Sequence, residues 1–255
     1  MAFVFDKMRP PLVAMVQDDT LAGALDVIVD SHYDGADAFG IQLEDLQPEY
    51  RNPKDLKTLF NACLGKPIYF TSYRSRLSKD LTDDERVELL LMGVEAGGDL
   101  ADVMGDLYDP QPHELTEAPA AVHKQKKLIE KIHSMGAQVL MSCHTHACLP
   151  DDEIVRYALA QKERGADVVK IVNECPTEED FRRAVNLPFM LKDVLGDTPF
   201  LFLAGGAHGR IIRQIGPQLG VCMYLCAPSH KPGYARMQPL LRAMKQVRDH
   251  MIYLP

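Results

Sequence analysis

The sequence lacks the features that would assign it to a special class of protein. No apolar run in its 255 residues reaches the ~18 residues of a membrane span, so we expect no membrane association. The formal net charge is -8 and no basic block occurs, so nucleic acids and anionic membranes would be repelled on average. No Gly/Ser linker divides the chain, which predicts a single domain over residues 1–255. Apolar and charged residues make up 46% and 25%, which excludes disorder, collagen and coiled coil.

A disulfide framework is also missing. None of the six cysteines forms a CxxC pair, and most lie inside apolar runs. The first ten residues, MAFVFDKMRP, lack a basic segment followed by an apolar stretch, so we do not expect a signal peptide. These patterns predict reduced thiols in a cytoplasmic protein. A homodimer is the default expectation for the assembly.

Short apolar runs alternate with longer amphipathic stretches throughout the chain. The runs have the length of buried strands and cover residues 11–17, 36–43, 66–73, 100–107, 137–143, 166–173, 198–204 and 219–226. The stretches between them have helical spacing and cover residues 20–31, 53–64, 82–96, 122–135, 151–164, 177–195, 208–215 and 238–251. Thr82 and Glu85 have the spacing of a capping box.

Eight strand–helix units predict an α/β fold with a parallel sheet. Because eight such units close a (β/α)₈ barrel, we expect a single TIM barrel. An open doubly wound sheet is the alternative. That fold usually has a glycine-rich first turn, and Val16-Gln17-Asp18-Asp19 contains no glycine.

Lys170 is the most unusual residue of the predicted strands. It lies in the apolar run Val168-Val169-Lys170-Ile171-Val172, where an unpaired ammonium would be costly to bury. Desolvation favours the neutral amine, which is nucleophilic, so Lys170 is a candidate catalytic residue. The structural alternative is a lysine paired with an acid such as Glu174 or Asp167.

Histidines end the preceding strand, in Ser142-Cys143-His144-Thr145-His146. Alternation places Ser142, His144 and His146 on one face, and His144 should stand at the barrel mouth, one strand from Lys170. His144 is therefore a candidate acid and base, since histidine transfers protons near neutral pH.

Further polar residues follow other strands. Arg74 ends the third run, and Arg213 follows a glycine-rich turn after the seventh; either could grip a carboxylate. His230 and Tyr234 lie in a loop after the eighth run and could contact a substrate.

These motifs resemble the type I 3-dehydroquinate dehydratase family. The resemblance is carried by Lys66 to Ser75, Val139 to His144, Gly165 to Ile171, the turn ending in Arg213, and Pro232-Gly233. It implies a (β/α)₈ barrel in which Lys170 forms an imine with a small carboxylated ketone, with no metal and no other cofactor. It also implies that His144 moves the protons, that Arg213 holds the carboxylate and that Arg74 contacts polar groups of the substrate.

The chain departs from the family in the residues that surround the substrate. The family's Glu-x-Arg, which binds substrate hydroxyls, is replaced by Gly40-Ile41-Gln42, and the glutamate that orients the histidine is replaced by Ser78. Its final Ser-x-Pro-Gly-Gln reads His230 to Tyr234. Gln42, His230 and Tyr234 are then candidate substrate-binding residues, and Glu174 or His146 would orient His144. A changed hydroxyl-binding shell predicts a changed substrate.

Three other functions compete with an imine-forming dehydratase. A class I aldolase would use the same imine to break a carbon–carbon bond. A metal-dependent hydrolase would use His144, His146, His208 and His230, with Lys170 as a carbamylated ligand. A non-catalytic barrel would only bind a keto acid.

Overall fold

A computed structural model describes residues 3–230 and 236–251. Eight strands alternate with eight long helices in this part of the chain, and every strand overlaps one of the apolar runs. In chain order the elements are β1 (Leu12–Val16), α1 (Leu21–Tyr33), β2 (Ala38–Gln42), α2 (Pro53–Asn61), β3 (Ile68–Thr71), α3 (Asp83–Ala96), β4 (Leu100–Met104), α4 (Pro119–Ser134), β5 (Gln138–His144), α5 (Asp151–Glu163), β6 (Val168–Glu174), α6 (Glu178–Leu195), β7 (Phe200–Gly205), α7 (Gly206–Ile215), β8 (Tyr224–Cys226) and α8 (Leu241–His250).

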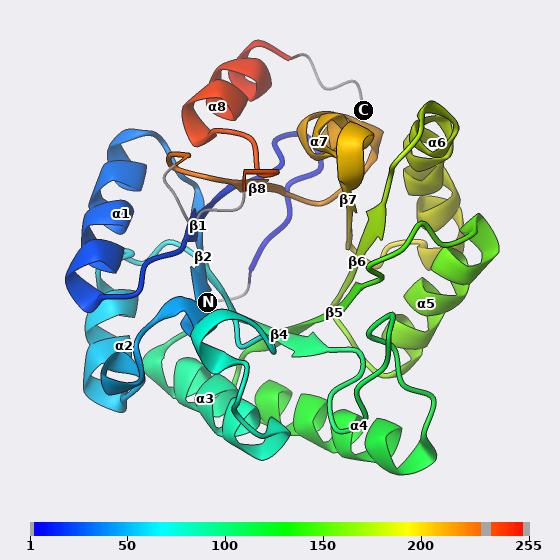
Figure 1. The fold of residues 1–255 in the computed structure, drawn as a ribbon. Helices are drawn as coiled ribbons and strands as arrows, with labels where there is room; N and C mark the ends of the chain where they lie inside the picture. Colours follow the sequence, from blue (N-terminus) through cyan, green and yellow to red (C-terminus); the bar gives the residue numbers. More distant parts are fainter. Residues whose placement is uncertain (1–2, 231–235, 252–255) are drawn as a thin grey trace.

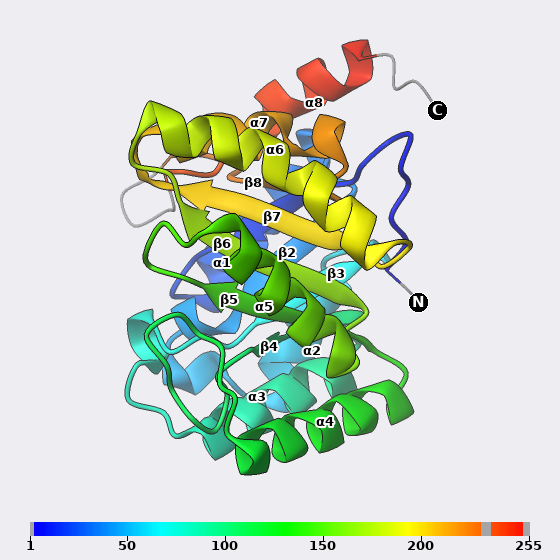
Figure 2. The same cartoon turned by 90° about the vertical axis from the view of Figure 1, so that its right-hand side faces the viewer.

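The strands form one parallel sheet that curls into a (β/α)₈ barrel, as the sequence predicts. Its order is β7-β6-β5-β4-β3-β2-β1-β8, so the strands from β1 to β7 pair with their neighbours in the chain and β8 returns beside β1. The Cys222 amide bridges the gap between β7 and β8 by donating to the Phe200 carbonyl at 2.9 Å. The helices surround the strands on the outside (Figures 1 and 2). The alternative of an open doubly wound sheet is wrong, because that fold needs a reversal of strand order.

The helix ends follow local signals in the sequence. Thr82 and Glu85 form the predicted capping box at the start of α3, and Gly97 ends that helix with φ +106°. The last helix is shorter than residues 238–251, because Leu240 pairs with Ala227 in an isolated bridge and α8 starts only after it.

Alternate residues of each strand contribute to different parts of the core. Along β1, Leu12 and Ala14 belong to the apolar cluster that contains Ile28 of helix α1. Met15 belongs to a second cluster, together with Tyr69 of β3. Because side chains alternate between the two faces of a strand, one set of β1 residues faces the helices and the other set faces the barrel interior.

Candidate active site

Lys170 lies inside the barrel and is only 3% exposed. Its Nζ atom donates to the hydroxyls of Tyr69, at 3.0 Å, and Tyr73, and lies 3.2 Å from Oδ2 of Asp102. Strands β6, β4 and β3 supply Lys170, Asp102 and Tyr69, so these side chains meet across the interior and not on the outer surface. The predicted orientation of Lys170 is therefore the one observed.

Asp102 is the acid that pairs with Lys170, rather than Glu174 or Asp167. Asp167 precedes the first residue of β6 and instead accepts from the Val139 amide at 2.7 Å. A carboxylate oxygen therefore lies 3.2 Å from Nζ of this buried amine. The expectation that desolvation keeps Lys170 neutral stays a prediction.

Asp102 also organises the two tyrosines. The hydroxyls of Tyr69 and Tyr73 both donate to Asp102 Oδ2, and they lie 3.1 Å from each other. Burial, followed by the charge of Asp102, raises the pKa of each phenol well above its ordinary value. Both hydroxyls are therefore neutral proton donors at physiological pH.

His144 stands at the mouth of the barrel, next to this cluster. Its ring meets the ring of Tyr73 edge-on, with 5.0 Å between centroids. Its Nδ1 lies 2.7 Å from Oε2 of Glu114, and its backbone amide donates to the same oxygen at 2.9 Å. The Glu114 carboxylate thus fixes the orientation of the imidazole and leaves Nε2 for proton transfer.

Glu114 takes the orienting role that the sequence assigned to Glu174 or His146. His146 Nε2 contacts the other oxygen of Glu114, at 3.3 Å, and does not hold His144. Glu174 lies against Gly205, where an added Cβ would come within 2.4 Å of its Oε1. That position places the carboxylate beside β7, and the expectation that Glu174 orients His144 is wrong.

A buried hydrogen-bond network holds the segment that carries Glu114. The Arg164 guanidinium donates to the Gly105 carbonyl and to Oε1 of Gln125, both at 2.9 Å, and also to the Thr116 carbonyl. The Cys143 thiol donates to the Glu114 carbonyl at 2.9 Å. Glu114 adopts φ +52°, a costly conformation for a residue with a side chain. The network fixes this strained backbone under His144.

Arg74 does not join the cluster. Its guanidinium donates to Asp83, at 3.0 and 2.8 Å, and to Asp106, at 2.6 Å. All three guanidinium nitrogens of Arg74 therefore donate hydrogen bonds to these two carboxylates, and the contacts hold the segment that follows β3 in place. Tyr73, one residue earlier, points into the barrel, where its hydroxyl contacts Lys170 and Asp102. At this strand end the structure therefore places Tyr73 in the site, and Arg74 binds the two carboxylates instead of facing a substrate.

Other predicted contacts lie around the mouth. Gln42 donates to Oε1 of the fully buried Glu44 at 2.9 Å, and His230 Nε2 lies 2.9 Å from the Gln238 carbonyl. Arg213 donates through Nε to the Ala204 carbonyl at 2.9 Å, and burial lowers its pKa to about 10, opposed by the charge of Glu174. Tyr234 falls outside the described residues.

Apolar side-chain atoms lie directly against the backbone at Gly40. A Cβ added at Gly40 would come within 2.4 Å of Met15 Sδ and 3.2 Å of the Tyr69 ring. Any residue larger than glycine at position 40 would therefore displace the Met15 side chain.

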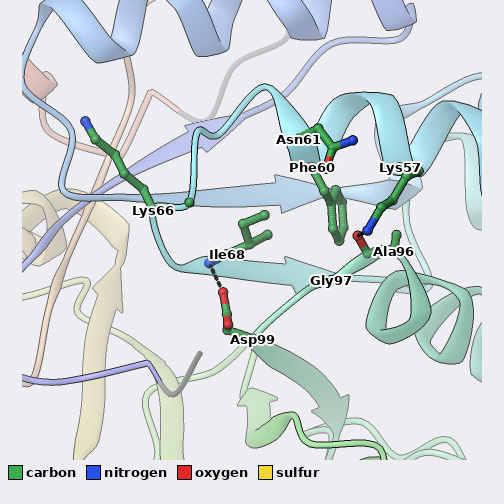
Figure 3. A pocket seen from close by; sticks show the side chains of 9 residues that line it. Lys57, Phe60, Asn61, Lys66, Ile68, Ala96, Gly97 and Asp99 are labelled. Atoms are coloured by element: carbon green, nitrogen blue, oxygen red, sulfur yellow. Dashed lines mark hydrogen bonds between the residues drawn. The ribbon is translucent and has the colours of Figure 1, made fainter.

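A pocket lies at the opposite end of the barrel, where β3 and β4 begin (Figure 3). Its polar groups are engaged in structural contacts: Asp99 accepts from the Ile68 amide at 2.9 Å, and Lys57 donates to the Ala96 carbonyl at 3.2 Å. Active sites of (β/α)₈ enzymes lie at the carboxyl ends of the strands, so this pocket is not the candidate site.

No metal-binding cluster of three or more His, Cys, Asp or Glu residues occurs in residues 3–230 and 236–251. His144 and His146 share the Glu114 carboxylate instead. In the same residues, no helix is long and apolar enough to cross a membrane.

The contact between Glu114 and His144 predicts a loss of stability in acid. Burial raises the pKa of Glu114, but the hydrogen bond and charge of His144 outweigh it and bring the value from 4.5 to about 2. Because the folded state has the lower pKa, the stabilisation is complete above pH ~4.5 and is lost as the pH falls towards 2. The full difference corresponds to roughly 3 kcal/mol.

Urea unfolding of the wild type and of Glu114→Gln between pH 2 and 6 measures this effect. The free energy of unfolding of the wild type should fall more steeply with acid than that of the variant. Equal slopes for the two proteins would show that Glu114 has an ordinary pKa in the folded state.

Comparison with known proteins identifies relatives of one family. The model of the family described as Type I 3-dehydroquinase matches residues 13–251. A 3-dehydroquinate dehydratase of Clostridium kluyveri is 27% identical over 126 residues; the match covers 48% of this chain and about half, 49%, of that relative.

Solved structures of the same enzyme share the fold. Type I 3-dehydroquinate dehydratase from Clostridium difficile, with covalently modified comenic acid, superposes with a TM-score of 0.80 at 18% identity, covering 97% of this chain and 94% of the other. The 3-dehydroquinate dehydratase from Geobacillus kaustophilus gives 0.79 at 17% identity, covering 94% and 90%. At these identities the likeness shows the barrel alone.

Proposed function

The chain belongs to the type I 3-dehydroquinase family, and we propose that it is a dehydratase that binds a carboxylated hydroxy-ketone as an imine on Lys170. The observation that carries the proposal is the Nζ atom of Lys170, buried in the barrel interior beside Asp102 and two phenols. A buried amine with hydrogen-bond partners for its proton is suited to nucleophilic attack on a carbonyl. His144 stands next to it, held by Glu114.

In the proposed reaction, the Lys170 imine draws electrons from the substrate and makes the neighbouring C–H bond more acidic. His144 removes that proton and later delivers a proton to the β-hydroxyl, which leaves as water. Arg213, half-buried after β7, holds the substrate carboxylate. Among the described residues its two terminal nitrogens have no hydrogen-bond partner, which supports this role.

We further propose that the substrate carries fewer or differently placed hydroxyls than 3-dehydroquinate. The resemblance places the family's glutamate at Gly40, where a built Cβ would lie 2.4 Å from Met15 Sδ, and Gln42 donates a hydrogen bond to Glu44. A site without partners for a hydroxyl binds it poorly, because the hydroxyl loses its water without compensation.

Borohydride reduction with three keto acids tests the proposed function. The panel is 3-dehydroquinate, 4-oxocyclohexanecarboxylate, which lacks hydroxyls, and pyruvate, which is small and acyclic. Mass spectrometry of the digested protein should find the reduced adduct on Lys170, and 4-oxocyclohexanecarboxylate should label it at least as fast as 3-dehydroquinate.

Each outcome of this experiment has a distinct meaning. If none of the three ketones labels Lys170, the imine mechanism is wrong. Faster labelling by 3-dehydroquinate, followed by release of 3-dehydroshikimate, would contradict the altered substrate and leave the imine mechanism intact. Cleavage of a carbon–carbon bond in a labelled β-hydroxy ketone would identify an aldolase instead of a dehydratase.

A further inference from the structure

Tyr73 connects Lys170 to Asp102 by a continuous line of hydrogen bonds. The Lys170 ammonium donates to Oη of Tyr73, and the Tyr73 hydroxyl donates to Oδ2 of Asp102. A proton can move along this line without crossing water, because the Tyr73 oxygen accepts a hydrogen bond from Lys170 and donates one to Asp102.

Two tyrosines contact Lys170, but only one of them is placed to reach a substrate. Tyr69 lies within β3 and is fully buried, and in the part of the chain that the structure describes its hydroxyl is hydrogen-bonded to Lys170, Asp102 and Tyr73. Tyr73 lies beyond the end of β3, is half-buried and packs edge-on against His144 at the barrel mouth. Among the described residues, no hydrogen bond joins His144 itself to Lys170.

We propose, on the basis of the proposed imine mechanism, that Tyr73 is a catalytic residue that exchanges protons during formation of the imine. A carbonyl carbon bonded to Nζ of Lys170 carries its oxygen one bond away, within reach of any hydroxyl that contacts Nζ. Tyr73 is the half-buried hydroxyl in that position. Asp102, on the inner side of the cluster, accepts the proton in the first step and holds it until the last.

The protons balance in three steps. First, Lys170 passes one proton through Tyr73 to Asp102, and the lone pair of the resulting amine bonds to the carbonyl carbon. A proton then moves from the nitrogen to the former carbonyl oxygen, which gives a neutral carbinolamine. Finally, Tyr73 protonates the carbinolamine hydroxyl, the C–O bond breaks, water leaves, the nitrogen lone pair completes the C=N bond, and Asp102 returns its proton to Tyr73.

The sum of these steps converts an ammonium and a ketone into a protonated imine and water. One positive charge is present before and after, and the Asp102 carboxylate faces it in both states. The cluster therefore needs no external acid or base to form the imine. Neutral phenols suit this role, because burial raises the pKa of Tyr73 well above its ordinary value and keeps the proton on the hydroxyl.

Timed borohydride trapping of Tyr73→Phe tests the proposal. Enzyme in excess is mixed with each of the two cyclic ketones named above and reduced after set intervals, and the adduct on Lys170 is quantified. Loss of a general acid–base group slows its step by ~10²–10⁴-fold, so we expect Tyr73→Phe to label at least about 100-fold more slowly. The final extent of labelling should match that of the wild type.

Two control variants separate catalysis from packing. Tyr157→Phe removes a hydroxyl from the outer helix α5 and should label at the wild-type rate. Tyr69→Phe removes the inner hydroxyl of the cluster but leaves the line through Tyr73, so its labelling should slow by less than about tenfold.

Labelling of Tyr73→Phe at the wild-type rate would overturn the proposal, and so would equal slowing of Tyr69→Phe and Tyr73→Phe. An absence of any adduct in the wild type would overturn the imine mechanism itself. The two failures are therefore distinguishable.

Discussion

Replacing Lys170 by alanine is expected to abolish both turnover and borohydride labelling. The proposed reaction proceeds through a covalent bond to Nζ, and among residues 3–230 and 236–251 no other lysine contacts the buried cluster of Asp102, Tyr69 and Tyr73. Removal of a covalent nucleophile costs roughly 10⁴-fold or more in turnover. Steady-state kinetics with the ketone that labels the wild type, together with mass spectrometry after borohydride treatment, measures both losses.

The same substitution also leaves the Asp102 carboxylate buried without its cation. Breaking a buried ion pair from one side costs about 3–5 kcal/mol, so Lys170→Ala should also unfold at lower urea concentrations. The double variant with Asp102→Asn removes that charge and should recover most of the stability while remaining inactive. If Lys170→Ala retained labelling, or kept turnover within tenfold of the wild type, the imine would have to form elsewhere.

The barrel could be predicted because its signals are local. Each strand is a short apolar run bounded by turn residues, and each helix has its own period and caps, as Thr82 and Glu85 show for α3. Eight repeats of that unit leave few topologies. The end of the chain was less predictable, since the start of α8 depends on a long-range bridge between Ala227 and Leu240.

The residues of the site were predictable only where a strand position revealed them. Lys170 and His144 could be found because polar residues are unusual in or directly after an apolar run. Asp102, in Leu100-Ala101-Asp102-Val103-Met104, carries the same signal, because a carboxylate in a buried apolar run needs a cation such as Lys170 as its partner. Alternation from Tyr69 would also have placed Tyr73, and not Arg74, inside the barrel.

Glu114 gives no such signal. It lies in the segment between β4 and α4, which has no periodicity, and this segment is held in place by Arg164 at the end of α5. Contacts between residues 48 and 59 positions apart are a property of the packed barrel, so the orienting acid could be identified only in the structure.

Replacing His144 by alanine is expected to separate formation of the imine from the chemistry that follows. Proton abstraction by a positioned histidine contributes ~10²–10⁴-fold, so turnover should fall by that factor. Lys170, Tyr73 and Asp102 remain in the variant, and these are the groups proposed to form the imine. Borohydride labelling of Lys170 should therefore stay within about tenfold of the wild-type rate, and the imine should accumulate during turnover.

Glu114→Gln should have an intermediate effect on turnover, because the amide can keep a hydrogen bond to His144 but lacks the charge of the carboxylate, and charged hydrogen bonds are the stronger ones. His123→Ala, on the exposed face of α4, is the matched control and should leave both turnover and labelling unchanged. If labelling of His144→Ala fell as far as turnover, His144 would be needed to form the imine. Proton transfer at that stage would then belong to the histidine, and Tyr73 would be left with a positioning role.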